Sequence, residues 1–340
     1  MTRNLPPTLV RLLPQIATLA VVLILNVILF PDFFDLSFQN ERLYGSLVDV
    51  FNRGAPVALL AVGMTLVIAT KGIDLSVGAV VAICGAVAAA SIASGHSAVV
   101  AIVAALAVGM LCGVWNGVLV AILGIQPIIA TLVLMVAGRG IAQLITEGAI
   151  LTFTDEGLIF IGSGTALGLP MPVVIWIVFG LLVTLLVRRT ALGLLIESIG
   201  VNRQASQLAG VRTTALLIAS YLLVGLCAAI AGLIVAADIK GADANNAGLW
   251  LELDAILAVV VGGNSLLGGR FSILGSLLGA VIIQAINTGI LTSGFPPEYN
   301  LIIKAVIIVA ILVIQSPRIG ELSAFFRSNR TGQGNQQGKS

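Results

Sequence analysis

Polar side chains that interrupt long apolar runs are the residues through which this chain could act on another molecule. Lys71, Asp74 and Ser76 share the stretch TKGIDLSVG (70–78), which separates two apolar runs. An ionisable group inside a membrane span is costly and marks a functional site, unless its charge caps a helix end. This stretch therefore either lies on a pathway for a polar molecule or joins two helices at a turn.

Three further polar residues lie within apolar runs. Asn116 either hydrogen-bonds a passing hydroxyl group or holds two helices together. Arg139 falls about 18 Å into its run at ~1.5 Å per residue, so its guanidinium must face protein or water. Gln143 follows one helical turn later on the same face. We expect this pair either to line a pathway or to cap a broken helix.

A small polar segment, GADANNAG (241–248), adds three more candidates. Asn246 belongs to it, and Glu252 and Asp254 follow it closely. The segment is either part of a gate beside a pathway or a flexible connector with an acidic helix cap. We keep all three residues as candidates for lining a translocation pathway.

The sequence holds no catalytic constellation and no nucleotide-binding loop. Its nearest match, GNSLLGGR (263–270), lacks the lysine and the hydroxyl of a phosphate-binding loop. The apolar runs contain no histidine, and their carboxylates, Glu147 and Asp254, lie near the ends of the runs. This pattern disfavours a proton relay, but it does not disfavour sodium coupling through backbone carbonyls. We expect no enzyme activity, cofactor, metal or nucleic-acid partner. Any ATP hydrolysis must come from another subunit.

Composition places these residues in a polytopic membrane protein of the all-α class. Hydrophobic residues make up 59% of the 340 residues and charged residues 9%, against about 25% charged in soluble domains. Backbone polar groups in lipid must be paired within helices or a closed barrel, and these runs are continuous rather than alternating. We expect ten spans, one or two of them short or broken, at 13–30, 55–70, 77–94, 98–123, 128–147, 171–187, 214–236, 253–262, 271–291 and 300–316.

The distribution of Lys and Arg orients these spans. With the N-terminus inside, the inner segments hold twelve of the 17 basic residues and the outer segments hold three. This is the positive-inside bias of membrane proteins. We therefore expect a cytoplasmic N-terminus (1–12), a transmembrane domain (13–316) and a disordered cytoplasmic tail (317–340).

Two glycine-rich stretches, KGIDLSVG (71–78) and GGNSLLGG (262–269), weakly resemble each other and interrupt apolar runs in the two halves of the chain. Breaks so placed point to a transport pathway. The charge count puts the first at an inner turn, with Lys71 at a helix C-terminus, Gly72 as its left-handed cap and Asp74 at the next N-terminus. The charges would then cap helices, and function would reside in the break.

Small residues predict close helix packing. Glycines occupy every fourth position of 109–117 and of 275–279, which lets helix backbones approach closely. Lys304, four residues into the last span, is expected to reach the lipid headgroups with its flexible stem.

The longest inner connection contains the segment 190–211. Residues 191–199 have an amphipathic helical pattern that Gly200 is expected to break, and Asn202 is expected to cap a second helix that ends at Gly210. The segment is either a surface on which a cytoplasmic partner acts or an ordinary pair of interfacial helices.

Four segments occur in the order found in permeases of ribose-type ABC sugar importers: TKGIDLSVG (70–78), WNGVLV (115–120), SIGVNRQASQLAGV (198–211) and ELDAILAVVVGGNSLLGG (252–269). The chain resembles this family, within the branched-chain amino acid and sugar permease superfamily, from about residue 50 to 316. Lys71, where many relatives have a small residue, and Ser206, where a second Ala is usual, depart from the family pattern. The resemblance implies a multi-pass permease domain in the bacterial inner membrane, surrounded by lipid.

The resemblance also implies partners. Such a permease pairs with a second permease subunit, identical or related, and carries ABC ATPase subunits on its cytoplasmic face. A periplasmic sugar-binding protein delivers the substrate. The residues of 190–211 expected to be exposed to the ATPase are Glu197, Asn202, Arg203 and Gln204.

Two segments, GADANNAGLWLELDAI (241–256) and SGFPPE (293–298), resemble the galactofuranose permeases of enteric bacteria within this family. The resemblance implies import of a monosaccharide, with galactofuranose as the best guess, by alternating access. The alternatives are an ABC permease for another small solute such as branched-chain amino acids, an ion-driven sugar carrier, and a membrane scaffold without transport. Scarce charge in the spans opposes the ion-driven carrier, and buried polar residues oppose the scaffold.

Overall fold

A computed structural model describes residues 7–39, 42–294, 296 and 299–315. The expectations for residues 1–6 and for the tail 317–340, and part of the segment SGFPPE, lie outside the described residues. The helices are α1 (Pro7–Leu29), η1 (Pro31–Phe34), α2 (Ser46–Arg53), α3 (Ala55–Ala69), α4 (Val77–Ala93), α5 (Ala98–Ala121), α6 (Pro127–Ile145), α7 (Glu156–Ser163), α8 (Met171–Arg189), α9 (Leu192–Val201), α10 (Arg203–Leu208), α11 (Thr213–Asp238), α12 (Leu251–Val261), α13 (Ile273–Thr292) and α14 (Asn300–Gln315).

Strands in the described part of the chain are two or three residues long and form three antiparallel pairs. They are β1 (Ser37–Gln39) with β2 (Arg42–Tyr44), β3 (Leu151–Thr152) with β6 (Gly241–Ala242), and β4 (Thr165–Ala166) with β5 (Leu169–Pro170). The all-α class is therefore confirmed, because these pairs only close loops between helices.

Each of the ten apolar segments expected from the sequence forms a helix with nearly the expected bounds. Among the described residues, six helices are long and apolar enough to cross a membrane, namely α1, α5, α6, α8, α11 and α13. The pair α2 and α3, bent by 43°, can form a seventh span. Helix α12 has 11 residues, as expected for half a span. These helix lengths establish a polytopic helical protein, but they do not establish the expected ten membrane crossings.

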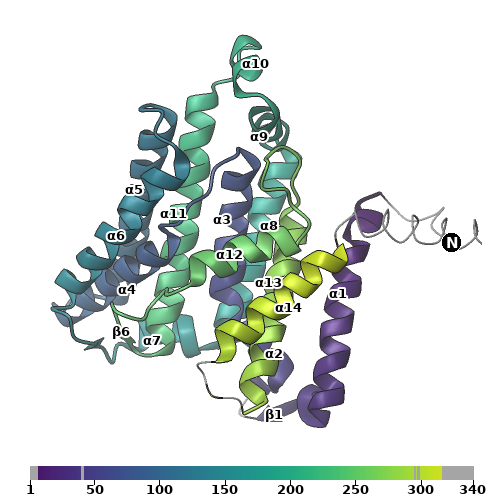
Figure 1. The fold of residues 1–340 in the computed structure, drawn as a ribbon. Helices are drawn as coiled ribbons and strands as arrows, with labels where there is room; N and C mark the ends of the chain where they lie inside the picture. The colour runs from purple at the N-terminus through teal and green to yellow at the C-terminus, as the bar shows by residue number, and fades with distance from the viewer. Residues whose placement is uncertain (1–6, 40–41, 295, 297–298, 316–340) are drawn as a thin grey trace, which may run out of the picture.

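Helix α11 lies at the centre of the bundle, between α5, α3 and α4 (Figure 1). Glycines every four residues along α5 face it: a Cβ on Gly113 would overlap the carbonyl of Tyr221, and one on Gly117 would meet Ile218. In the same way Gly279 of α13 lies against the Ala258 carbonyl of α12. The close packing expected from both glycine patterns is confirmed, because no larger residue fits at these contacts.

The first break (residues 70–76) is a turn at Thr70 and Lys71 followed by irregular backbone, and it separates α3 from α4. Lys71 has a left-handed backbone, with φ of 67°, whereas Gly72 does not. The expected glycine cap is therefore wrong. Gly72 instead supplies space, since a Cβ there would lie 2.7 Å from Tyr221 Oη and 2.9 Å from Val67 Cγ1.

Helices α9 and α10 form the pair of short helices expected within 190–211. Figure 1 shows α10 beyond the ends of α5 and α11, and α9 beyond the end of α3. Asn202 caps α10 by accepting a hydrogen bond from Ala205 N at 3.0 Å, as expected. Gly210 follows with φ of 85°. Gly200 does not break α9, which runs on to Val201. A glycine is required at position 200 for close packing, because a Cβ there would overlap the backbone of Ala69.

Candidate functional site

The first break carries a buried polar cluster of three predicted residues. Asp74 Oδ1 accepts hydrogen bonds from Ser76 N at 2.9 Å and from Ser76 Oγ at 2.6 Å. Asn116 Nδ2, from α5, donates to Ser76 Oγ at 2.8 Å and lies 3.4 Å from Asp74 Oδ2. All three side chains are buried. Asp74 thus forms a turn with Ser76, the residue before α4, but no side-chain cap to the N–H groups of α4 is formed, so the expected helix cap is wrong. Asn116 joins the break to α5.

Two polar atoms beside this cluster have no hydrogen-bond partner among the described residues. They are Asn116 Oδ1, an acceptor, and Tyr221 Oη, which can donate or accept. Both are buried, and Tyr221 Oη faces the backbone of Gly72 in the break. Buried polar groups without partners are rare. The cluster therefore has spare hydrogen-bonding capacity of the kind that a hydroxyl group satisfies.

The second break (residues 262–272), between α12 and α13, has a polar cluster of its own. Asn264 Nδ2 donates to Ser276 Oγ at 2.8 Å, and Asn264 Oδ1 accepts from Ser272 N at 2.6 Å. Ser276 Oγ lies 2.6 Å from Thr65 Oγ1, which links this break to α3. The sequence reasoning missed these residues. The signal available was the single asparagine in GGNSLLGG, since a buried amide must find partners.

Arg139 and Gln143 both reach the loop that precedes α12. Arg139 Nη1 donates to the carbonyls of Ala244 at 3.1 Å and Ala247 at 2.6 Å. Gln143 Nε2 donates to Asn245 Oδ1 at 2.8 Å. The geometry shows a brace on this loop, and the groups that Arg139 and Gln143 bond do not belong to a helix end, so the capping of a broken helix also stays a prediction. A role in lining a pathway stays a prediction.

The same loop is stabilised from within by Asp243. Its Oδ2 accepts from Asn246 Nδ2 at 2.8 Å, and its Oδ1 accepts from the backbone N–H groups of Asn245 and Asn246 at 3.0 and 3.2 Å. The Asn246 side chain, by this hydrogen bond, holds the pKa of Asp243 below its ordinary value. Asn246 also lines a pocket of about 290 Å³ with Asn52, Arg53 and Asp238. The loop is therefore an internally hydrogen-bonded turn, and the expected acidic cap is not formed, because α12 begins after Trp250 with no side-chain cap.

Glu252 and Asp254 occupy the first turn of α12, and both are buried. The Glu252 carboxylate lies against Gly78 in the first turn of α4, where a helix dipole favours negative charge. Asp254 forms an ion pair with Lys304 of α14, with distances of 2.7 and 2.9 Å to its two oxygens. The expectation that Lys304 reaches lipid headgroups is wrong, because its buried partner holds it inside the bundle.

The four residues expected to face a cytoplasmic partner divide into two pairs. Asn202 and Gln204 are exposed. Glu197 is half-buried, and its Oε1 lies 3.4 Å from Phe271 N. Arg203 is also half-buried and donates through Nη2 to the Ala121 carbonyl at 3.0 Å. The expectation of exposure is therefore wrong for Glu197 and Arg203, which contact their own chain.

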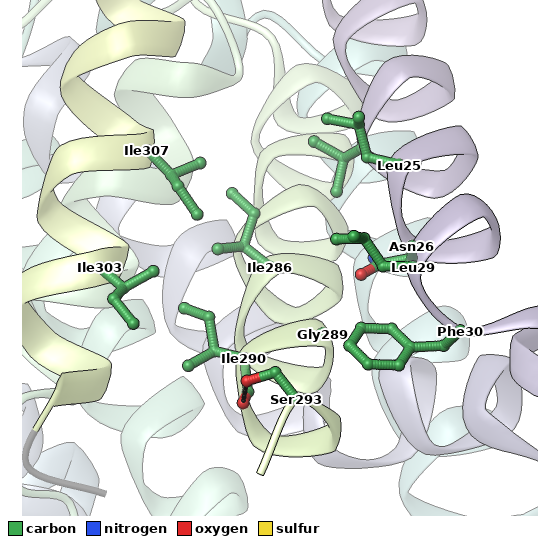
Figure 2. Close-up of a pocket in the computed structure, with 11 residues that line it drawn as sticks. Leu25, Asn26, Leu29, Phe30, Ile286, Gly289, Ile290, Ser293, Ile303 and Ile307 are labelled. Atoms are coloured by element: carbon green, nitrogen blue, oxygen red, sulfur yellow. Dashed lines mark hydrogen bonds between the residues drawn. The ribbon is translucent and has the colours of Figure 1, made fainter. Parts of the chain in front are cut away.

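An apolar pocket of about 200 Å³ lies between α1, α13 and α14. Figure 2 shows Leu25 and Leu29 of α1 facing Ile286 of α13 and Ile307 of α14 across it. Asn26 turns its amide to α13 and donates to the Ala285 carbonyl at 3.1 Å. With so few polar atoms, this pocket does not suit a hydroxyl-rich molecule.

These features define a polytopic membrane permease: apolar spans, two breaks with buried hydroxyl and amide clusters, and a pair of short helices at one end of the bundle. The chain belongs to the family described as branched-chain amino acid transport system, permease component, which it matches over residues 46–312. It is a multi-pass protein of the bacterial inner membrane.

Curated relatives span nearly the whole chain. The chain is 58% identical to the galactofuranose transporter permease protein YtfT of Escherichia coli K12, over 93% of both chains. It is 42% identical to the fructose import permease protein FruF of Bifidobacterium longum, over 93% of this chain and 90% of the relative. It is 38% identical to the ribose import permease protein RbsC of Escherichia coli K12, over 90% and 95%. No solved structure matches the chain.

Proposed function

We propose that this chain is the membrane-spanning subunit of an ABC importer that moves a monosaccharide, galactofuranose in the first instance, into the cytoplasm. One observation carries the proposal: the 58% identity to a galactofuranose transporter permease extends over 93% of both chains. Similarity to fructose and ribose import permeases supports the broader class of sugar substrates.

The polar clusters at the breaks suit such a substrate. Asp74, Ser76 and Asn116 place carboxylate, hydroxyl and amide groups beside the first break, with Asn116 Oδ1 and Tyr221 Oη buried without partners among the described residues. Groups of these kinds hydrogen-bond sugar hydroxyls. A permease must bind weakly enough to release its cargo. We infer that opening of the first break exposes this cluster to the sugar in transit.

Arg139, Gln143 and Asn246 act, in this proposal, on the outer side of the pathway. They shape the loop before α12, and Glu252 and Asp254 follow in the first turn of that helix. The ordered loop then forms a surface on which a periplasmic sugar-binding protein docks. Hydrogen bonds between this loop and α6 would transmit the docking of the binding protein to the helix bundle.

The partners follow from the same proposal. A second permease subunit, identical or related, completes the pathway, and ABC ATPase subunits dock on α9 and α10. Asn202 and Gln204, which are exposed, contact the ATPase. The energy comes from ATP hydrolysis on that partner, since this chain carries no phosphate-binding loop.

Uptake by the reconstituted complex tests the proposal. The permease is placed in proteoliposomes with its ATPase and binding protein, and labelled galactofuranose uptake is measured with and without ATP, with an ATPase variant that cannot hydrolyse ATP as control. Unlabelled galactofuranose, ribose, fructose and leucine compete in separate arms. We expect ATP-dependent uptake that galactofuranose inhibits most strongly. Strongest inhibition by leucine, or uptake that persists without ATP and collapses with an ionophore, would overturn the proposal.

A further inference from the structure

A pocket of about 290 Å³ lies between α2, the end of α11 and the loop that precedes α12. Figure 1 shows α2 and β6, the strand that follows α11, at the end of the bundle opposite to α9 and α10. Pockets that bind small molecules typically measure roughly 300–1,000 Å³. The volume of this pocket therefore suits a ligand at the small end of that range.

Two opposite charges line the pocket, and neither of them is paired. Arg53 is the last residue of α2 and Asp238 is the last residue of α11, and both are exposed. Within the part of the chain that the structure describes, neither side chain forms a hydrogen bond or an ion pair. A helix dipole disfavours a carboxylate at a C-terminus, so Asp238 does not stabilise its own helix. Both charged groups are available to a ligand.

Two amides and an apolar wall complete the lining of the pocket. Asn52 has a buried Oδ1 without a hydrogen-bond partner among the described residues. Asn246 donates to Asp243 Oδ2 at 2.8 Å, which fixes its side chain at the pocket. Ile234 and Leu251 contribute apolar surface. Small-molecule sites have this composition, with a few fixed polar groups on a mainly apolar wall.

The chemistry of these groups selects a neutral ligand with several hydroxyl groups. A guanidinium only donates hydrogen bonds and a carboxylate only accepts them, whereas a hydroxyl group does both. One positive and one negative charge cancel, which disfavours an anion such as a sugar phosphate. A zwitterionic amino acid would also balance the two charges, but the two amides and the similarity to sugar permeases favour a sugar.

We propose that this pocket is a receiving site for the monosaccharide on the outer side of the permease, in which Arg53 and Asp238 hydrogen-bond the sugar hydroxyls. This rests on the proposed function, which supplies the class of substrate. Asn246 and Ala247 of the loop braced by Arg139 form one wall of the pocket. A binding protein docked on that loop thus releases its sugar beside the pocket. The site binds weakly, because a permease must release its cargo.

Sugar binding in the absence of the binding protein tests the proposal. The complex of permease and ATPase in detergent micelles is titrated with methyl galactofuranoside, whose ring form is fixed, and saturation-transfer-difference NMR gives the Kd. We expect Arg53→Ala and Asp238→Ala each to raise the Kd about ten-fold, because each removes hydrogen bonds to a charged group. Lys240→Ala and Glu156→Ala, which remove exposed charges outside the pocket, should leave the Kd unchanged.

Uptake and docking measurements separate the alternatives. ATP-dependent sugar uptake should fall in both pocket variants, while association of the binding protein with the complex, measured by biolayer interferometry, should be unchanged. An unchanged Kd would overturn the inference. So would weaker association of the binding protein with no loss of sugar affinity, or a stronger NMR signal from leucine than from the sugar.

Failure of the proposed function gives a different result. If the unaltered complex shows no ATP-dependent sugar uptake, the proposed function fails and the inference fails with it. If the unaltered complex transports the sugar and the pocket variants bind it with an unchanged Kd, only the inference fails.

Discussion

Replacing Lys304 with methionine removes the cation of the buried ion pair between α12 and α14 and keeps the unbranched stem. Lys304 Nζ donates to both oxygens of Asp254, at 2.7 and 2.9 Å, and each side chain is 11% exposed. At an effective dielectric constant of about 20, unit charges about 3 Å apart attract by roughly 6 kcal/mol, much of which offsets their desolvation. Lys304→Met keeps the buried carboxylate and loses that attraction. We expect the free energy of unfolding to fall by about 3–5 kcal/mol.

A double variant separates the buried charge from the loss of a contact. Asp254→Leu with Lys304→Met removes both charges and keeps similar volumes, so we expect a free energy of unfolding within about 1–2 kcal/mol of the unaltered protein. Unfolding is followed by tryptophan fluorescence as SDS is added to the protein in mild detergent micelles. Lys240→Met, at an exposed lysine, is the control.

Two results would refute this reasoning. The first is a Lys304→Met variant as stable as the Lys240→Met control, which would mean that the pair contributes nothing inside the bundle. The second is a double variant less stable than Lys304→Met, which would mean that the loss of packing, and not the uncompensated Asp254 charge, causes the damage.

Three further predictions concern the loop before α12 and the packing of that helix. Arg139→Met removes two charge-assisted hydrogen bonds to loop carbonyls, worth roughly 1.5–3 kcal/mol each, so amide hydrogen exchange in the loop should accelerate. Unchanged exchange would contradict the role of Arg139 as a brace of this loop. Because the pKa of Asp243 lies below its ordinary value, its carboxylate stabilises the loop at neutral pH, and this stabilisation is lost as the pH falls through the lowered pKa. Amide hydrogen exchange in the loop should therefore accelerate as the pH falls through that pKa. Asp243→Asn should abolish this pH dependence. Gly279→Ala should destabilise the protein by about 1–3 kcal/mol in the same SDS titration, because its Cβ meets the Ala258 carbonyl, while Gly140→Ala, where nothing lies within 4 Å of an added Cβ, should leave stability unchanged.

Local patterns in the sequence predicted the features that depend on neighbouring residues. The apolar runs gave the helices, because a span of apolar residues must pair its own backbone in lipid. Asn202 was identified as the cap of α10, because capping involves an amide only three residues away. The half-length α12 and the position of both breaks followed from glycines between apolar runs.

Features that depend on distant partners were predicted poorly. Lys304 was expected at the membrane surface, but its partner Asp254 lies 50 residues away on another helix. Glu197 was expected to be exposed, yet it is half-buried and contacts Phe271, 74 residues away. Nothing in the neighbourhood of either residue indicates which helix it will meet. Lys71 has the left-handed backbone that was expected of Gly72, whereas Gly72 leaves space for Tyr221 from α11.

The sequence by itself determined that this is an all-helical permease of the inner membrane, with two breaks and a structured segment at 190–211. The helical membrane class follows from composition and periodicity, and the permease and its membrane are implied by motifs that resemble the family. Only the tertiary structure decided what each polar side chain does there. Arg139 became a brace for a loop 105 and 108 residues away, and Gly200 became the point at which α9 packs on the end of α3. A buried polar group must be paired, but the helix that supplies its partner is chosen by packing of the whole bundle.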